Sequence, residues 1–269
     1  MGTRPVKRNV LGVLVDQTTY QQAVDAVVDA ARHGRPFALT ALAVHGVMTG
    51  VLDHEHGARL NSFDLVTPDG QPVRWALNAL HRAGLTERVS GPTLTLRVLR
   101  AAADEGLPVY LYGSTEQTLD RLALNLQNTL PALKIAGREA SKFRTARLGE
   151  DREIADRITA SGARIVLVGL GCPRQEIFVH AMRPLLPMPL LAIGAAFDFH
   201  AGILRRPPKW IRRYGLEWLS RLASEPGRLW RRYLTLNPHY LLLVAAQKAG
   251  LTRPAPPPPS TNRQAAFPV

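Results

Sequence analysis

A carboxylate, Asp69, stands at the end of an apolar run in "VTPDGQPV" (66–73), between a proline and a glycine. A Pro-Asp-Gly turn is common for structural reasons alone. A carboxylate at the carboxyl end of a strand can also act as a general base and take a proton from a substrate hydroxyl. The residues around Asp69 leave both interpretations open.

A second candidate is the glycine-rich segment "VLVGLGCPRQE" (166–176), whose pattern predicts a strand, a turn and the start of a helix. Backbone amides and the helix dipole at such a turn can bind a phosphate, although glycines after strands are also common in structural turns. Arg174 stands where the dinucleotide fingerprint G-x-G-x-x-G needs its last glycine, which weakens an NAD-linked oxidoreductase as an interpretation. Gln175 adds an uncharged group that can hydrogen-bond a sugar or a base.

The sequence offers few groups of metal ligands. In "DHEH" (53–56), His54 and His56 are two residues apart and do not share a helix face, which favours a solvated helix end over a metal site. No D-x-D pair is present to hold a divalent ion against a nucleotide-sugar diphosphate. The single cysteine, Cys172, is interpreted as a small buried residue and not as a nucleophile. We therefore expect neither a metal nor a cofactor.

These residues need a scaffold, and the first two-thirds of the chain alternates short β-rich runs with amphipathic stretches. That alternation is typical of an α/β fold with a mostly parallel sheet. The run "VLGVLVD" (10–16) is followed by Thr18 and Thr19, each with a glutamine three residues later, and this capping-box pattern predicts a helix start. Five further runs are predicted to be strands: 37–41, 63–67, 109–113, 164–169 and 190–194.

In an open parallel sheet, the ligand lies beyond the carboxyl ends of the strands. The residues at or directly after the ends of the predicted strands therefore form the expected site. These residues are Thr40, Asp69, 113–115, 169–175 and 194–198.

The chain has 269 residues, is 46% hydrophobic and carries a net charge of +13, so it can bury a core. The positive charge favours an anionic partner: a phosphorylated ligand, a nucleic acid or an acidic lipid surface. A single cysteine rules out an intrachain disulfide, and no apolar run is suited to a signal peptide or a membrane span. We expect a cytoplasmic protein whose contact with a membrane is peripheral.

The composition predicts three units: an α/β core (1–203), a helical appendage (204–249) and a disordered proline-rich tail (250–269). The appendage holds ten basic and two acidic residues and three of the four tryptophans, in two predicted helices that break near 225–227. Such a segment is compatible with a solvated helix face, with a nucleic-acid-binding stripe, or with helices that lie on a membrane. Composition does not choose among them.

Longer motifs connect these elements to a known family. The run "AIGAAFDFHAGILRRPPKWIRRYGLEWLSRLASEPGRLWRRY" (192–233), together with "GLGCPRQE", closely resembles the WecG/TagA/CpsF glycosyltransferases, family 26 of the glycosyltransferase classification. "TPDGQPV", "ERVSGPTL" and "LYGST" match in the same order, so that the resemblance extends roughly from Val10 to Tyr240. It implies a Rossmann-like core followed by an arginine-rich helical appendage.

The resemblance implies an inverting, metal-independent enzyme that transfers a sugar from a UDP-sugar to a polyprenyl-pyrophosphate-linked saccharide. The product belongs to a cell-surface polysaccharide such as an exopolysaccharide or a teichoic acid. Such an enzyme works as a peripheral protein on the inner face of the plasma membrane and has no nucleic-acid partner. Family members often self-associate, which leaves a homo-oligomer open.

The resemblance also implies roles for single residues. Asp69 matches the proposed catalytic base of the family. Substrate contacts are implied for Thr40, Arg88 and Gln175, and for three appendage arginines that would close over the site and hold the diphosphates: Arg221, Arg228 and Arg231. With UDP as the expected ligand, five strand-end residues are expected to contact the nucleotide: Gly113, Gly169, Gly171, Phe197 and Asp198.

Two positions depart from the family pattern. Leu42 stands where asparagine is frequent, and His45, one turn later, is the candidate for the missing polar contact. Thr93 stands where aspartate is frequent. Because such positions face the sugars, the resemblance implies a UDP-sugar donor and leaves the identity of the sugar open.

The main alternative from another class is a basic, non-catalytic nucleic-acid-binding protein. It accounts for the charge and the aromatic residues of the appendage. It does not account for the cluster of Asp69, Arg88 and Gln175 at strand ends.

Overall fold

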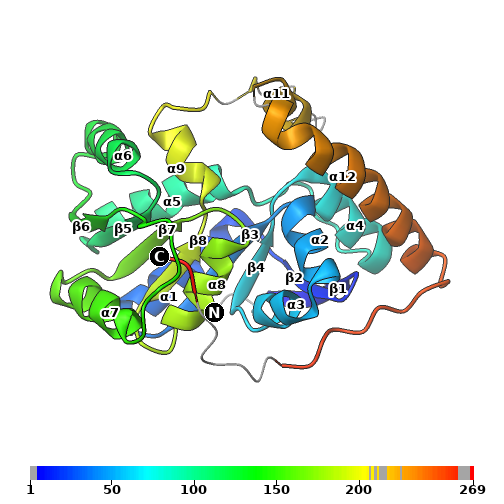
Figure 1. Cartoon of the computed structure of the whole chain (residues 1–269), viewed down its shortest axis with the longest axis horizontal. Coiled ribbons are helices and arrows are strands. Elements are labelled where there is room, and N and C mark those ends of the chain that lie inside the picture. Colours follow the sequence, from blue (N-terminus) through cyan, green and yellow to red (C-terminus); the bar gives the residue numbers. More distant parts are fainter. Residues whose placement is uncertain (1–4, 206, 209–210, 212–216, 225, 260–266) are drawn as a thin grey trace.

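The fold is built on a six-stranded parallel sheet with the strand order β4-β3-β8-β7-β5-β6 (Figure 1). The computed structural model describes residues 5–205, 207–208, 211, 217–224, 226–259 and 267–269, and in parts of the last two helices it describes the backbone alone. The strands are β3 (Phe37–Leu42), β4 (Leu65–Pro68), β5 (Val109–Gly113), β6 (Ile135–Glu139), β7 (Ile165–Gly169) and β8 (Pro189–Ala192). The predicted α/β class is confirmed.

Helices cover both faces of this sheet, as in a doubly wound fold. Successive side chains of a strand point to opposite faces of the sheet. Leu190 therefore packs in the hydrophobic cluster on one face and Leu191 in the cluster on the other. One face is covered by α1 (Tyr20–Arg32), α5 (Gly91–Asp104), α6 (Glu116–Thr129) and α9 (Ala195–His200). The other is covered by α2 (Val44–Leu52), α3 (His54–Asn61), α4 (Gln71–His81), α7 (Glu150–Ala160) and α8 (Arg174–Met182).

The parallel register brings the carboxyl ends of the strands to one edge. Gly113 at the end of β5 lies opposite Gly169 at the end of β7, and Val168 of β7 lies opposite Ala192 of β8. Each of the five strands predicted between residues 37 and 194 is present. β6 was not predicted, because its sequence "IAGRE" has one β-branched residue and a central glycine.

The N-terminal run predicted as β-rich is part of an antiparallel hairpin, β1 (Val6–Val10) and β2 (Val13–Gln17), joined by a two-residue turn with positive φ angles. The predicted capping box after it is confirmed. The Thr19 hydroxyl accepts a hydrogen bond from the Gln22 amide, and the Gln22 side chain accepts one from the Thr19 amide. Helix α1 therefore begins at Tyr20.

The appendage contains the two predicted helices, α11 (Glu217–Ser224) and α12 (Pro226–Lys248). Helix α12 packs against α2 and α4 (Figure 1). The Tyr240 side chain is 1% exposed and donates a hydrogen bond to the carbonyl of Pro72. The second half of α12 thus shares the hydrophobic core of the preceding residues. None of the helices that the structure describes has the length and hydropathy required to cross a membrane.

The chain after Gly250 was expected to be disordered, but parts of it pack against the core, although most of residues 251–259 are exposed. The side-chain amide of Asn9 donates to the carbonyl of Pro254 at 2.7 Å. Further on, the ring of Phe267 lies edge-on to Phe178 with 5.9 Å between centroids, and Val269 is fully buried. The expectation was wrong for these residues because prolines exclude regular ladders but not an extended path, in which no backbone donor is needed.

Candidate active site

Asp69 lies directly after β4, in a turn that backbone hydrogen bonds fix in place. Its amide donates to the carbonyl of Leu42 at 2.9 Å, and its Oδ2 accepts from the amide of Gly91 at 3.0 Å. The next residue, Gly70, has a φ of 108°, which lets the chain turn into α4. Because one carboxylate oxygen is anchored, the orientation of the whole carboxylate is set before a ligand arrives.

Two cavities meet at Asp69. The larger has a volume of about 530 Å³ and lies beyond the carboxyl ends of the strands. The smaller has a volume of about 140 Å³ and lies between the core and the appendage. Residues that line both cavities are Ala43, His45, Asp69, Pro92 and Ala195. Asp69 therefore contacts the space in which two bound ligands would face each other.

The larger cavity has a polar floor made by the loops after two central strands. Ser114 and Thr115 follow β5, and the side chain of Thr115 caps α6. Gly169 ends β7, Gly171 follows it, and Asp198 belongs to α9. The structure therefore places three of the predicted nucleotide-contacting residues, Gly169, Gly171 and Asp198, in the wall of one cavity.

Gly113 and Phe197 were also expected to contact the nucleotide, but neither of them lines the larger cavity, so this contact stays a prediction. Phe197 is 2% exposed, and its ring packs so closely on Gly169 that an added Cβ would lie 2.5 Å from it. Gly113 has a φ of 104°, and a Cβ there would lie 2.8 Å from the carbonyl oxygen of Gly169. Both residues pack against Gly169 and bring the strand ends together beneath the cavity. A position near a strand end does not by itself decide whether a residue faces the cavity.

Gln175 lines the larger cavity, and both ends of its amide are held. Its Oε1 accepts from the amide of Gly194 at 2.8 Å, and its Nε2 donates to Oε1 of Glu176 at 2.9 Å. The hydroxyl of Thr40 donates to the same carboxylate oxygen at 3.0 Å. Thr40 is fully buried behind the cavity wall, so its link to a ligand runs through Glu176 and Gln175.

Arg88 lines the smaller cavity and forms an ion pair with Glu217, at the start of α11. Burial lowers the pKa of the Arg88 guanidinium, but the neighbouring carboxylates of Asp69 and Glu217 outweigh burial and raise the pKa above its ordinary value. The arginine therefore stays charged between the base and the appendage, where it favours an anionic ligand. The three predicted appendage arginines, Arg221, Arg228 and Arg231, belong to α11 and α12, but their side chains lie outside the described residues.

His45 lies in the first turn of α2 and lines both cavities, and its role in substrate contact stays a prediction. An aromatic wall of the smaller cavity was not predicted. Trp218 and Tyr233 stand there with 5.7 Å between ring centroids, next to Asn237. The signal was present in the aromatic residues of the appendage, some of which were expected to complete the site, but the sequence did not identify which ones.

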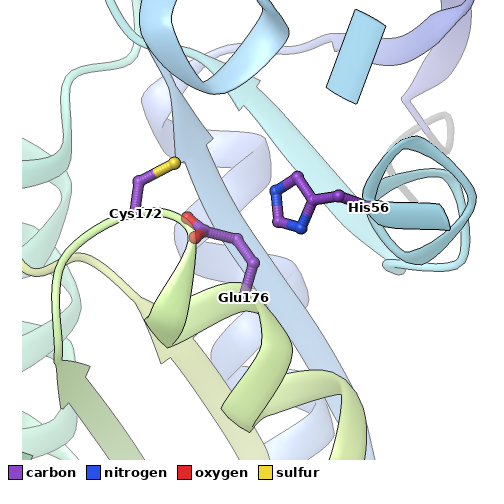
Figure 2. A group of neighbouring side chains, drawn as sticks. All are labelled: His56, Cys172 and Glu176. Carbon is purple, nitrogen blue, oxygen red and sulfur yellow. The ribbon is translucent and has the colours of Figure 1, made fainter. Parts of the chain in front are cut away.

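A buried group of potential metal ligands was also missed (Figure 2). His54 is exposed, as expected for a solvated helix end, but that expectation was wrong for His56, which is 1% exposed and lies next to Cys172 and Glu176. Cys172 is only half-buried and lines the larger cavity. The group was hidden because His56 lies more than a hundred residues before Cys172 and Glu176 in the sequence.

Comparisons with known proteins place this chain in a family. The family model described as "Glycosyl transferase WecG/TagA/CpsF family" matches residues 8–254 of this chain. The N-acetylglucosaminyldiphosphoundecaprenol N-acetyl-beta-D-mannosaminyltransferase of Bacillus spizizenii strain W23 is 31% identical over 198 residues, which cover 73% of this chain and 74% of the relative. The protein of the same name from Bacillus subtilis strain 168 is 29% identical over 199 residues, 74% of this chain and 75% of the relative. The chain therefore belongs to the WecG/TagA/CpsF family and is a glycosyltransferase.

Proposed function

We propose that the enzyme transfers a sugar from a UDP-sugar to a polyprenyl-pyrophosphate-linked saccharide, with inversion at the anomeric carbon and without a metal in the chemical step. The product would belong to a cell-surface polysaccharide. The observation that carries this proposal is the position of Asp69 at the junction of the two cavities. A direct transfer needs a base that reaches the acceptor hydroxyl while the donor lies on the other side.

The larger cavity is suited to the donor. Its volume of about 530 Å³ lies in the usual range for small-molecule sites. The glycines after β7 leave backbone amides accessible, and the start of α6 carries a partial positive charge, so that both favour the UDP diphosphate. The amide of Gln175 and the hydroxyls of Ser114 and Thr115 offer hydrogen bonds to the ribose, the uracil or the sugar.

The smaller cavity is suited to the terminal sugar of the acceptor. Trp218 and Tyr233 present aromatic faces against which the apolar side of a sugar ring can pack, and Asn237 adds an amide. Arg88 lies in the same wall, beside the position of the base. A sugar bound here would direct a hydroxyl toward Asp69.

In the proposed reaction, Asp69 takes the proton of the acceptor hydroxyl while that oxygen attacks the anomeric carbon. The new bond joins the acceptor oxygen to this carbon, and the bond from the carbon to the UDP oxygen breaks with its electron pair on UDP. Arg88 and the appendage arginines would balance the negative charge of the diphosphates. Attack from the side opposite to UDP inverts the configuration.

The lipid-linked acceptor requires the enzyme to reach a membrane surface. Three exposed apolar side chains of α12, Trp230, Leu234 and Leu241, are spaced four and seven residues apart and share one face of the helix. Together with the basic residues of the appendage, this face supports peripheral docking on the inner face of the plasma membrane. Self-association stays a prediction.

The names of the relatives point to the first substrates to test, an N-acetylmannosaminyl donor and an N-acetylglucosaminyl-diphospholipid acceptor. Leu42 lines the larger cavity as an apolar group, and Thr93 accepts a hydrogen bond from Ser90. Because these two positions lack the polar groups frequent in the family, we propose a panel of UDP-sugars, with UDP-N-acetylmannosamine as one member.

The proposal is tested first by calorimetric titration with UDP in the presence of EDTA, with NADH as the control nucleotide. We expect saturable UDP binding and none of NADH. UDP-sugars are then incubated with a short-chain lipid-diphosphate acceptor, and the glycosylated lipid is detected by mass spectrometry. Absence of UDP binding would contradict the donor site, whereas UDP binding without transfer to any lipid-diphosphate would contradict the acceptor.

A further inference from the structure

Three side chains from two distant parts of the chain converge at the wall of the larger cavity (Figure 2). His56 comes from the first turn of α3, Cys172 from the loop after β7, and Glu176 from the first turn of α8. Their nitrogen, sulfur and oxygen atoms all lie within 4.8 Å of one another. The group thus joins α3 to the loop that forms part of the cavity wall.

Two members of the group are buried with unused hydrogen-bonding capacity. His56 is 1% exposed, and neither of its ring nitrogens has a hydrogen-bond partner among the described residues. Glu176 is fully buried, and its Oε1 accepts from Thr40 and Gln175. Apart from a hydrogen bond of the carboxyl group with the Cys172 thiol, its Oε2 has no partner among the described residues. Leaving such groups unsatisfied costs free energy, so they call for a ligand that uses the nitrogen and the oxygen together.

The chemistry of the three groups fits Zn²⁺. Thiolate, imidazole and carboxylate are its usual ligands, whereas Mg²⁺ and Ca²⁺ prefer sets made of oxygen alone. Bonds of about 2.0–2.3 Å in a tetrahedral arrangement require ligand atoms about 3.3–3.8 Å apart. Small rotations of the side chains would bring the group from its present spacing to that geometry.

The charges of the group are compatible with this assignment. No ion pair of Glu176 occurs in the described part of the chain. Thiolate and carboxylate together would balance the two charges of the ion, and binding would release the protons of both groups.

We propose that His56, Cys172 and Glu176 bind one Zn²⁺ ion, with the fourth position open to the larger cavity, which Cys172 and Glu176 line. The hydrogen bonds from Thr40 and Gln175 orient the carboxylate for the ion. The site holds α3 against the loop after β7. Asp69 is not one of its ligands, and the ion takes no part in the proton transfer.

The first experiment uses Co²⁺ as a spectroscopic probe of the full-length protein after treatment with a chelator. Because Cys172 is the single cysteine, a thiolate-to-cobalt absorption band in the near ultraviolet reports on this site. We expect the band, together with visible absorption typical of tetrahedral cobalt, to saturate at one ion per chain and to disappear when Zn²⁺ is added. Absence of a saturable band would overturn the proposal.

Variants separate this site from adventitious binding. Cys172→Ser should abolish the near-ultraviolet band, and His56→Gln should weaken Co²⁺ affinity about tenfold or more. His54→Gln is the matched control, because this exposed histidine lies two residues away in the same helix. Equal affinities of the two histidine variants would show that the ion binds elsewhere.

The unmodified protein provides a test that does not depend on the folding of variants. Zn²⁺ should slow the alkylation of Cys172 by iodoacetamide about tenfold or more, because a metal-bound thiolate is a poor nucleophile. An unchanged alkylation rate at saturating Zn²⁺ would contradict the proposal. These readouts need no UDP and no transfer, so a failure here leaves the proposed function untouched, and UDP binding in EDTA can fail without affecting the metal site.

Discussion

The two cavities beside Asp69 are built in different ways. The larger is made by loops at the ends of parallel strands, and its side chains hold one another, as Gln175 is held by Gly194 and Glu176. The smaller exists only because α11 and α12 lie over the core, and an ion pair between Arg88 and Glu217 joins the two parts. Donor binding should therefore be a property of the core, and acceptor binding a property of the core and the appendage together.

The largest effect is expected where the two cavities meet. Asp69→Asn keeps the shape of the side chain and the hydrogen bond from Gly91 but removes the base. Transfer should fall by about 10²–10⁴-fold, and the affinity for UDP should not change. Turnover is measured by mass spectrometry of the lipid product and UDP affinity by calorimetry.

Asp156→Asn is the control for this substitution, because Asp156 is exposed on α7, away from both cavities. It should leave turnover and UDP affinity unchanged. Near-normal turnover by Asp69→Asn would assign the proton transfer to another group.

A methyl group added to the wall of the larger cavity should act on donor binding alone. In Gly194→Ala the new Cβ would overlap the amide oxygen of Gln175 and approach the amide nitrogen of Gly171 to 2.9 Å. We expect UDP affinity to fall about tenfold, a loss of about 1.4 kcal/mol, because the added methyl group displaces groups in the cavity wall. Calorimetry with UDP measures the loss.

Gly227→Ala is the matched control, because nothing lies within 4 Å of a Cβ at that position. It should bind UDP as the unmodified protein does. If Gly194→Ala retained full UDP affinity at an unchanged melting temperature, the donor would not occupy the larger cavity.

A substitution in the smaller cavity should affect acceptor binding and leave donor binding unchanged. Trp218→Ala removes part of its aromatic wall, so KM for a short-chain acceptor should rise about tenfold while UDP affinity stays constant. Trp75→Ala serves as the control, because Trp75 is 45% exposed on α4 and lines neither cavity. Equal loss of donor and acceptor binding in Trp218→Ala would show that the cavities are not separate subsites.

The smallest effect is expected in the loop that carries Phe143 to the larger cavity. Glu150 braces this loop by accepting hydrogen bonds from Arg144, Lys142 and the amide of Arg147, which hold its pKa well below the ordinary 4.5. A depressed pKa means that this stabilisation is present at neutral pH and is lost as pH falls below 4.5.

Glu150→Gln should therefore lower the melting temperature at pH 7 by about 2–4 °C and weaken its dependence on acid pH. UDP affinity should fall only slightly. Glu153→Gln, in an exposed position of the same helix, should leave both unchanged. An acid dependence identical to that of the unmodified protein would assign acid lability to other carboxylates.

The larger cavity could be predicted from the sequence to a greater extent than the smaller one. Strand periodicity and the glycines after β7 located the sheet edge, because those signals are local. The rule that ligands lie beyond the carboxyl ends of the strands does not separate Gly169, in the cavity wall, from Phe197, in the core beneath it. That difference depends on packing, which decides where a side chain points. The inward position of His56 likewise depends on α8, which comes more than a hundred residues later.

The smaller cavity and the tail depend on contacts that no local pattern encodes. Charge indicated a role for the appendage, but the packing of Tyr240 into the core and the position of Trp218 in the same cavity wall as Asp69 are tertiary contacts. The proline content of the tail concealed the burial of Phe267 and Val269 in the same way.

The hairpin β1–β2 has a consequence for the order in which the protein is made. The amide of Leu11 donates to Gln247, whose side chain in turn donates to the carbonyl of Asn9, and Asn9 also binds Pro254. These partners leave the ribosome after more than two hundred intervening residues, so the segment synthesised early cannot complete its contacts until the α12 region has emerged. The nascent core therefore has an unfinished edge during most of translation, and closing that edge is one of the last steps of folding.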